Sequence, residues 1–173
     1  MTEGPTDANR ERSDLIGALA HQRELLKRTV TGISEEHARQ HPTLSALCLG
    51  GLIKHVTRVE QNWCNFITQG TSAIGSADAA SYAAHAASFE MTDDETMPDL
   101  LEKYDAVGRA TEELIISLPS LDVAHLLPDA PWFEQGASWS ARRVLVHIIA
   151  ETAQHAGHAD IIREALDGAK TMG

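Results

Sequence analysis

The sequence has little positive charge, few cysteines and no long apolar run. Only 14 of its 173 residues are Lys or Arg, against 25 that are Asp or Glu, and the formal net charge is -11. Such an acidic chain is repelled by nucleic acid and by anionic membranes, so we expect neither as a partner. No apolar stretch approaches the length of a membrane span. Cys48 and Cys64 lack CxxC spacing and no secretory signal precedes them, so we expect reduced thiols in a cytoplasmic protein.

Strand-like alternation and internal repeats are also missing, whereas helical periodicity is strong. Apolar residues recur every three or four positions in four stretches, which predicts four long amphipathic helices. These lie in residues 11–30, in a segment after residue 42 that includes 52–66, in 92–118 and in 138–168. We therefore expect an all-α fold, a four-helix bundle in one domain over residues 11–173, after a disordered tail at residues 1–10.

The connections between these helices differ in composition. Residues 34–39 form a short acidic turn, read as a linker or one turn of helix. Residues 70–81 are rich in Gly, Ala and Ser and predict a long connection between the second and third helices, with a weak helical patch at 82–89. Residues 92–95 read as a capping box that starts the third helix. Residues 119–137 predict a structured loop across one end of the bundle.

The last helix carries two polar residues in the middle of its apolar stripe, Glu151 and His155. Residues four apart lie on one side of a helix, so the two side chains can aim at one point. A buried carboxylate costs several kcal/mol unless it is compensated, and a divalent cation compensates it well. His55 lies on the apolar stripe of the second helix and supplies a third candidate ligand. Three protein ligands and one open position are typical of a catalytic zinc site.

Other polar and aromatic residues have weaker claims to function. His158 and His147 flank the pair on the last helix and fit a supporting or proton-shuttling position better than direct ligation; local hydrogen bonding is the simpler reading for both. Trp132 and Phe133, on the loop, are candidates for a substrate-binding wall. The remaining residues have simpler interpretations. We expect Trp63 and Trp139 to pack in the core, Arg142 and Arg143 to lie on a solvated helix face, and Cys48 to be an inert thiol.

Two strings carry a family resemblance, CLGGLIKHVTRVEQNW at residues 48–63 and VHIIAETAQHAGHADIIREALDG at 146–168. Together they resemble the DinB-like superfamily, in its DUF664-type branch. The resemblance implies a DinB/YfiT-like four-helix bundle, often a homodimer, with one metal ligand on the second helix and two on the last. Carried over by position, these ligands are His55, Glu151 and His155. Many relatives have an HxxxH pair, and the ExxxH pair here looks more like that of the mycothiol-dependent maleylpyruvate isomerase.

The resemblance implies a divalent metal as cofactor and a low-molecular-weight thiol, such as mycothiol or bacillithiol, as co-substrate. Two imidazoles and a carboxylate suit zinc first, and also nickel, manganese or iron(II). Three hypotheses follow. The first is metal-dependent transfer of the thiol, with mycothiol preferred, to small electrophiles; the second is thiol-assisted isomerisation of a small unsaturated acid. The third is a metal-binding bundle without turnover.

Overall fold

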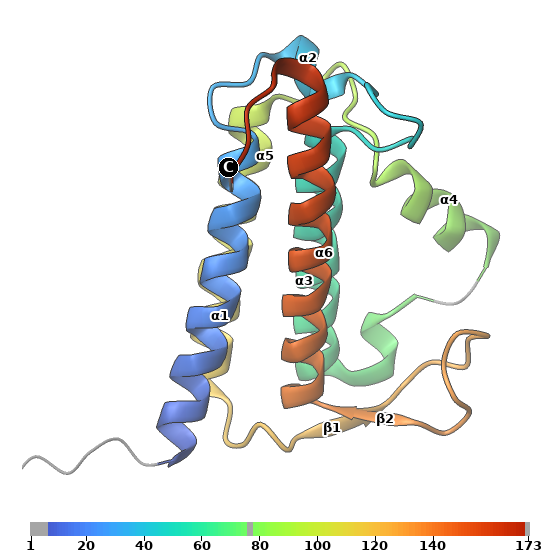
Figure 1. Ribbon diagram of the computed structural model, residues 1–173. Coiled ribbons are helices and arrows are strands. Elements are labelled where there is room, and N and C mark those ends of the chain that lie inside the picture. Colours follow the sequence, from blue (N-terminus) through green and yellow to red (C-terminus); the bar gives the residue numbers. More distant parts are fainter. Residues whose placement is uncertain (1–6, 76–77, 172–173) are drawn as a thin grey trace, which may run out of the picture.

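The computed structural model describes residues 7–75 and 78–171, and most of these residues are helical. Four long helices lie side by side in Figure 1: α1 (Asp7–Thr29), α3 (Leu49–Gln69), α5 (Met97–Ser117) and α6 (Ala141–Asp167). Helix α3 packs against α5 and α6, and α1 packs against α6 and α5. The predicted all-α class is therefore right in outline. Within the described ranges, no helix combines the length and apolar character that a membrane crossing requires.

The N-terminal helix starts earlier than the sequence predicts. Helix α1 begins at Asp7 rather than at residue 11, so residues 7–10 continue the helix where a disordered tail was expected. The remainder of that predicted tail, residues 1–6, lies outside the described residues.

The third long helix starts later than the sequence predicts, at Met97 instead of within residues 92–95. Thr96 is its N-cap, and its hydroxyl oxygen accepts from the Asp99 backbone N–H at 3.3 Å. A helix from residue 93 would place Pro98 in its interior, where the missing N–H and the ring break the backbone ladder. The Thr92 N–H still donates to the Glu95 carboxylate at 2.9 Å, but this contact closes a turn.

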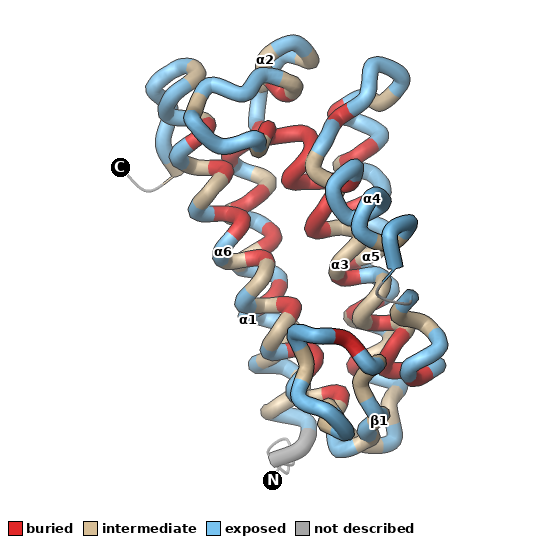
Figure 2. The backbone as a smooth tube through the Cα atoms, turned by 90° about the vertical axis from the view of Figure 1, so that its right-hand side faces the viewer, coloured by how far each residue is buried: buried red, intermediate tan, exposed pale blue. Residues whose placement is uncertain are grey.

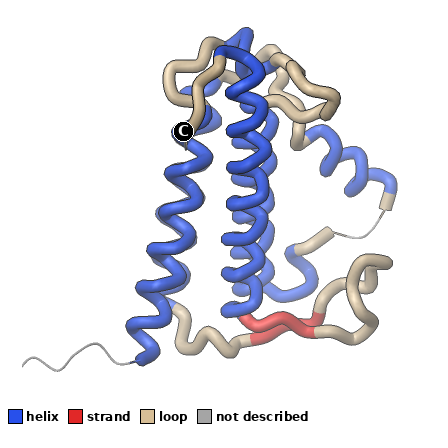
Figure 3. Tube along the Cα trace, viewed as in Figure 1, coloured by secondary structure: helices blue, strands red, loops and turns tan. Residues whose placement is uncertain are grey.

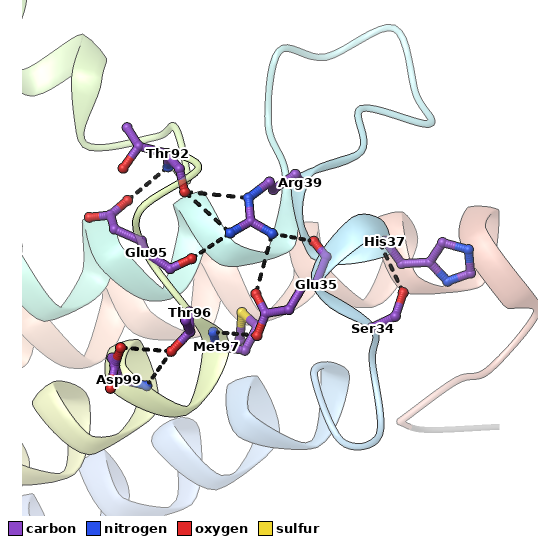
Figure 4. A network of polar contacts seen from close by, with 9 residues as sticks. All are labelled: Ser34, Glu35, His37, Arg39, Thr92, Glu95, Thr96, Met97 and Asp99. Atoms are coloured by element: carbon purple, nitrogen blue, oxygen red, sulfur yellow. Dashed lines mark hydrogen bonds and ion pairs between the residues drawn. The ribbon is translucent and has the colours of Figure 1, made fainter.

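A short helix holds that turn in place. Helix α2 (Glu35–Arg39) is the single turn of helix allowed by the acidic segment 34–39. Figure 4 shows the Arg39 guanidinium donating to the backbone carbonyls of Thr92 and Glu95. The Glu35 carboxylate accepts from the Met97 N–H at 2.9 Å. These bonds fix the segment that leads into α5 next to α2.

The long connection after α3 contains a 3-10 turn, η1 (Gly70–Ala73), and helix α4 (Ala79–Ala87). The helical patch predicted at residues 82–89 therefore begins three residues earlier and ends two residues earlier. No residue of α4 is buried, and Figures 1 and 2 show the helix standing off from the packed helices as an exposed element.

The loop at residues 119–137 contains a strand that periodicity did not predict. Strand β1 (Ala124–Leu126) pairs antiparallel with β2 (Ser138–Ser140), and the two strands lie side by side in Figure 3. In this pairing His125 lies opposite Trp139. Strands of three residues are too short to show an alternating pattern, which explains the omission. Helix α6 then begins after its N-cap Ser140 and ends at Gly168, whose φ of 78° is the left-handed conformation expected of a terminating glycine.

The apolar core is divided into two clusters along the long helices. One cluster lies toward α2 and includes Leu52 and Ile162; the other lies toward the small sheet and includes Phe66 and Ile148. Between them the helices carry buried polar side chains: Arg23, His55, Glu60, Thr111, Thr152 and His155. The candidate ligands of the sequence analysis therefore lie in a polar layer between two apolar ones.

Candidate metal centre

The three predicted ligand residues lie together where α3 packs against α6. His55 comes from α3, and Glu151 and His155 come from α6. One donor atom from each side chain lies within 4.8 Å of the donor atoms of the other two, so the three form a group that could hold a metal ion. His55 is 3% exposed and His155 8% exposed, whereas the Glu151 side chain is 29% exposed.

The geometry of the α6 pair follows from the helix itself. Glu151 Oε2 lies 3.5 Å from His155 Nε2, with the two residues four apart on one face. Two ligands that each sit about 2.0–2.2 Å from one tetrahedral zinc are roughly 3.3–3.6 Å apart. The spacing of this pair therefore already fits a shared ion.

Hydrogen bonding fixes which nitrogen of His55 is available. Ser88 Oγ donates its proton to the His85 carbonyl at 2.6 Å and lies 2.9 Å from His55 Nδ1. A serine hydroxyl has one proton, so here its oxygen can only accept from His55, which must carry its hydrogen on Nδ1. The Nε2 lone pair is left free. Orientation of a ligand imidazole by a bond to its other nitrogen is a common feature of metal sites.

The environment also favours the protonation states that a metal requires. Burial, assisted by the nearby His155, lowers the pKa of His55 from 6.5 to about 3. A hydrogen bond from His155, together with the nearby His147, holds the pKa of Glu151 below its usual value, although partial burial opposes this shift. At neutral pH the group therefore presents a neutral imidazole and a carboxylate, as metal ligation demands.

Sequence reasoning missed two residues that pack against His55. The Phe89 ring stacks on the His55 ring, with centroids 3.8 Å apart and planes at 19°, and the His85 ring meets it edge-on at 5.3 Å. Both belong to α4 or to the segment after it. Gly50 and Gly51 let that segment approach α3, because a Cβ on Gly51 would overlap the Phe89 carbonyl and one on Gly50 would overlap Met91. Adjacent glycines at the start of a helix were the available signal of such a close approach.

The flanking histidines lie beside the group of three. His158 Nδ1 is 3.4 Å from His155 Nδ1, the nitrogen that faces away from Glu151, and His158 is not among the described residues that line the adjoining cavity. His147 Nε2 lies 3.7 Å from Glu151 Oε1, and burial lowers the pKa of His147. Each of the two therefore lies within about one hydrogen-bond length of one candidate ligand.

A cavity of about 400 Å³ opens beside the three residues. His55, Glu151 and His155 form part of its wall, and Trp132 and Phe133, the predicted substrate-binding residues, form another part. Trp63, for which core packing was favoured, also lines the cavity while it stacks on Trp139 with centroids 4.9 Å apart. The cavity therefore combines a polar face with an aromatic one, as small-molecule sites often do.

The remaining candidates lie elsewhere. Arg142 forms ion pairs with Glu11 and Asp122, and Arg143 lies 4.6 Å over the Trp139 ring. Cys48 is buried, and its sulfur accepts from the Gly51 N–H at 3.4 Å at the start of α3. None of the three residues lines the cavity, and the ion pairs of Arg142 differ from the solvated helix face expected for it.

The donor set fits a divalent cation. Two imidazole nitrogens and a carboxylate oxygen converge, and the ion pairs that the described residues form with Glu151 come only from histidines. A divalent cation between these atoms would supply the positive charge that no Lys or Arg among the described residues brings to Glu151.

One comparison with known proteins found a match. A family model described as Mycothiol-S-transferase matches residues 14–168, a range that includes all three residues of the group. A search of curated proteins returned no match.

Proposed function

The chain belongs to the mycothiol S-transferase family, and we propose that it transfers mycothiol to small electrophiles with a divalent metal held by His55, Glu151 and His155. The observation that carries the proposal is the convergence of these three side chains at the wall of a cavity. A metal at this site would lower the pKa of a bound thiol, so that the thiolate is available at neutral pH.

The residues at the proposed metal site have separate roles. His55 and His155 offer nitrogen lone pairs, and Glu151 offers the negative charge. Ser88 holds the His55 ring in the required tautomer. In the transfer itself, the sulfur forms a bond to an electrophilic carbon while the bond from that carbon to its leaving group breaks. The leaving group, bromide in the case of monobromobimane, departs with the bonding pair, and the thiol proton passes to solvent. Catalysis then depends chiefly on placing the two substrates next to each other.

The adjoining cavity favours turnover over a purely structural metal. A structural zinc is normally closed off by four protein ligands, whereas catalytic zinc keeps a position for substrate. Here three candidate ligands face a cavity of about 400 Å³. We propose that Trp132 and Phe133 bind the electrophile there, and that His158 supports His155 from outside the cavity.

The finer properties of the protein are also part of the proposal. Zinc is the preferred metal, with nickel, manganese or iron(II) as alternatives, because two imidazoles and one carboxylate accept all four. We propose that the packed long helices form a DinB-like four-helix bundle, that residues 11–173 are one domain, and that the protein acts as a cytoplasmic homodimer.

The test is metal content and thiol transfer in His55→Ala. We expect wild-type protein to bind about one metal ion per chain and to accelerate the reaction of mycothiol with monobromobimane. His55→Ala should lose both properties and keep its helical circular dichroism. His21→Ala, which removes an exposed histidine from α1, is the control and should behave as wild type.

Three results would count against the proposal. Stoichiometric metal in His55→Ala would refute the ligand assignment. Metal-loaded wild-type protein that shows no heat of mycothiol binding in calorimetry would favour a metal-binding protein without turnover. Rapid conversion of maleylpyruvate without bimane transfer would favour the isomerase hypothesis.

A further inference from the structure

A second cavity, of about 520 Å³, adjoins the one beside the metal ligands. The two cavities share Asn62, Ile74, His85 and Trp132 in their walls, so they lie next to each other. The second cavity has no function in the proposal above. Its size falls within the range of small-molecule sites.

Arg58 gives this second cavity its character. The residue lies on α3 one turn after His55, which places the two Cβ atoms about 5–6 Å apart on the same helix face. One of its guanidinium nitrogens, Nη1, donates to the Ala84 carbonyl, which anchors the side chain to α4. A guanidinium has five N–H donors, so most of them stay available to a ligand.

The charge of Arg58 has no counterion in the described structure. Among the described residues, no carboxylate lies within ion-pair distance of it, although the chain carries a net charge of -11. The described lining of the second cavity contains no Asp or Glu. In such an acidic protein, an unpaired arginine in a cavity calls for an anionic ligand, and its planar fork matches a carboxylate.

Another part of the wall is aromatic and exposed. Tyr82 and Trp132 meet edge to face with ring centroids 5.8 Å apart, and they are 51% and 57% exposed. Exposed aromatic side chains at a cavity are a common feature of binding sites for planar or apolar groups. The cavity thus offers both a cation and an aromatic surface to a ligand.

We infer that the Arg58 cavity binds the carboxylate of the electrophilic substrate, and that this substrate joins its carboxylate to a planar apolar group. The inference rests on the proposed function, because it assigns the second substrate of that reaction. With the carboxylate at Arg58, the reactive carbon lies past the residues that the two cavities share, on the side of the metal ligands. For a halogenated acid, the C–S bond forms as the carbon–halogen bond breaks, halide leaves with the bonding pair, and the thiol proton goes to solvent.

The test is equilibrium binding, which requires no turnover. Benzoate and benzamide have nearly the same shape and differ in charge, and they are titrated by NMR into the full chain treated with EDTA, so that no metal competes for the carboxylate. Wild-type protein should bind benzoate on the order of tenfold more tightly than benzamide. Arg58→Gln should bind both equally, and Arg58→Lys should keep part of the preference.

Arg109→Gln is the matched control, because it removes the same charge from the exposed face of α5. It should keep the full preference for benzoate. Equal binding of the two probes to wild type, no binding of benzoate, or an equal loss in Arg109→Gln would overturn the inference. The result does not depend on mycothiol, so a failure here is distinct from a failure of the transferase proposal.

Discussion

Two buried polar clusters interrupt the apolar packing of α3, and they differ in how their charges are compensated. In the first, which we call the closed cluster, Glu60 is fully buried and accepts hydrogen bonds from Arg23 and Thr111. In the second, the open cluster of His55, Glu151 and His155, the described residues place no Lys or Arg against the carboxylate. The two clusters are little more than one helical turn apart on α3.

The difference separates a structural role from a functional one. Glu60 has its cation, Arg23, within the fold, so its charge is compensated by the chain itself. Among the described residues, the ion-pair partners of Glu151 are imidazoles, and a cavity lies beside it. A buried carboxylate therefore indicates a ligand site only when the chain supplies no positively charged side chain to compensate it. An internal ion pair already offsets the free-energy cost of burying the charge.

The largest effect expected is on stability, in the closed cluster. Glu60→Ala leaves Arg23, which is 8% exposed, without its main partner, and should lower the free energy of unfolding by about 3–5 kcal/mol. Glu151→Ala, measured without metal, should change it by no more than about 1 kcal/mol, because this side chain is partly exposed. Urea unfolding in EDTA measures both. Equal losses would remove the distinction between the clusters.

The next effect is on metal affinity, in the open cluster. Ser88→Ala removes the acceptor that fixes the His55 tautomer, and should weaken metal binding about 10–100-fold while the fold remains. Ser81→Ala serves as the control. It removes a hydroxyl from the same connecting region, but this hydroxyl is not the one that His55 contacts. Competition with a fluorescent chelator measures the affinities. Unchanged affinity in Ser88→Ala would mean that the hydroxyl does not orient the ligand.

A smaller effect concerns how the segment after α4 reaches the open cluster. Gly51→Ala would drive a Cβ into the Phe89 carbonyl and should destabilise the protein by about 1–3 kcal/mol. Gly157→Ala on α6 meets no atom within 4 Å and should stabilise it by roughly 0.5–1 kcal/mol. Thermal unfolding of the two variants should shift in opposite directions. A gain in Gly51→Ala would show that the close approach is not required.

The smallest effect is a pH dependence that only the open cluster should contribute. The pKa of His55 is lowered to about 3 in the fold from 6.5, so below pH 6.5 the unfolded chain binds a proton that the folded chain does not. The contribution of His55 to the free energy of unfolding is therefore fully present above pH 6.5 and falls on acidification, by about 1 kcal/mol between pH 6.5 and 5.5. In EDTA, the free energy of unfolding of His55→Gln should fall less between pH 6.5 and 5.5 than that of wild type. Parallel pH profiles of variant and wild type would contradict the prediction.

The sequence by itself determined what helical periodicity can express. The helical class, the end of α6 at Gly168 and the alignment of Glu151 with His155 all follow from contacts within about one turn of a helix. His55 could be named because it lies inside an apolar stripe. The predicted beginning of α5 was too early, because residues 92–95 fit a capping-box pattern, whereas Pro98 is compatible only with a helix that begins near Met97.

Only the tertiary structure decided which residues surround those ligands. Ser88, Phe89 and His85 reach His55 because the segment after α4 crosses the glycines of α3, and Arg58 faces a cavity because α4 stands off from the long helices. The burial of Glu60 depended on Arg23 arriving from α1. Such contacts join residues far apart in the chain, and no local period records them, because they arise from how whole elements pack.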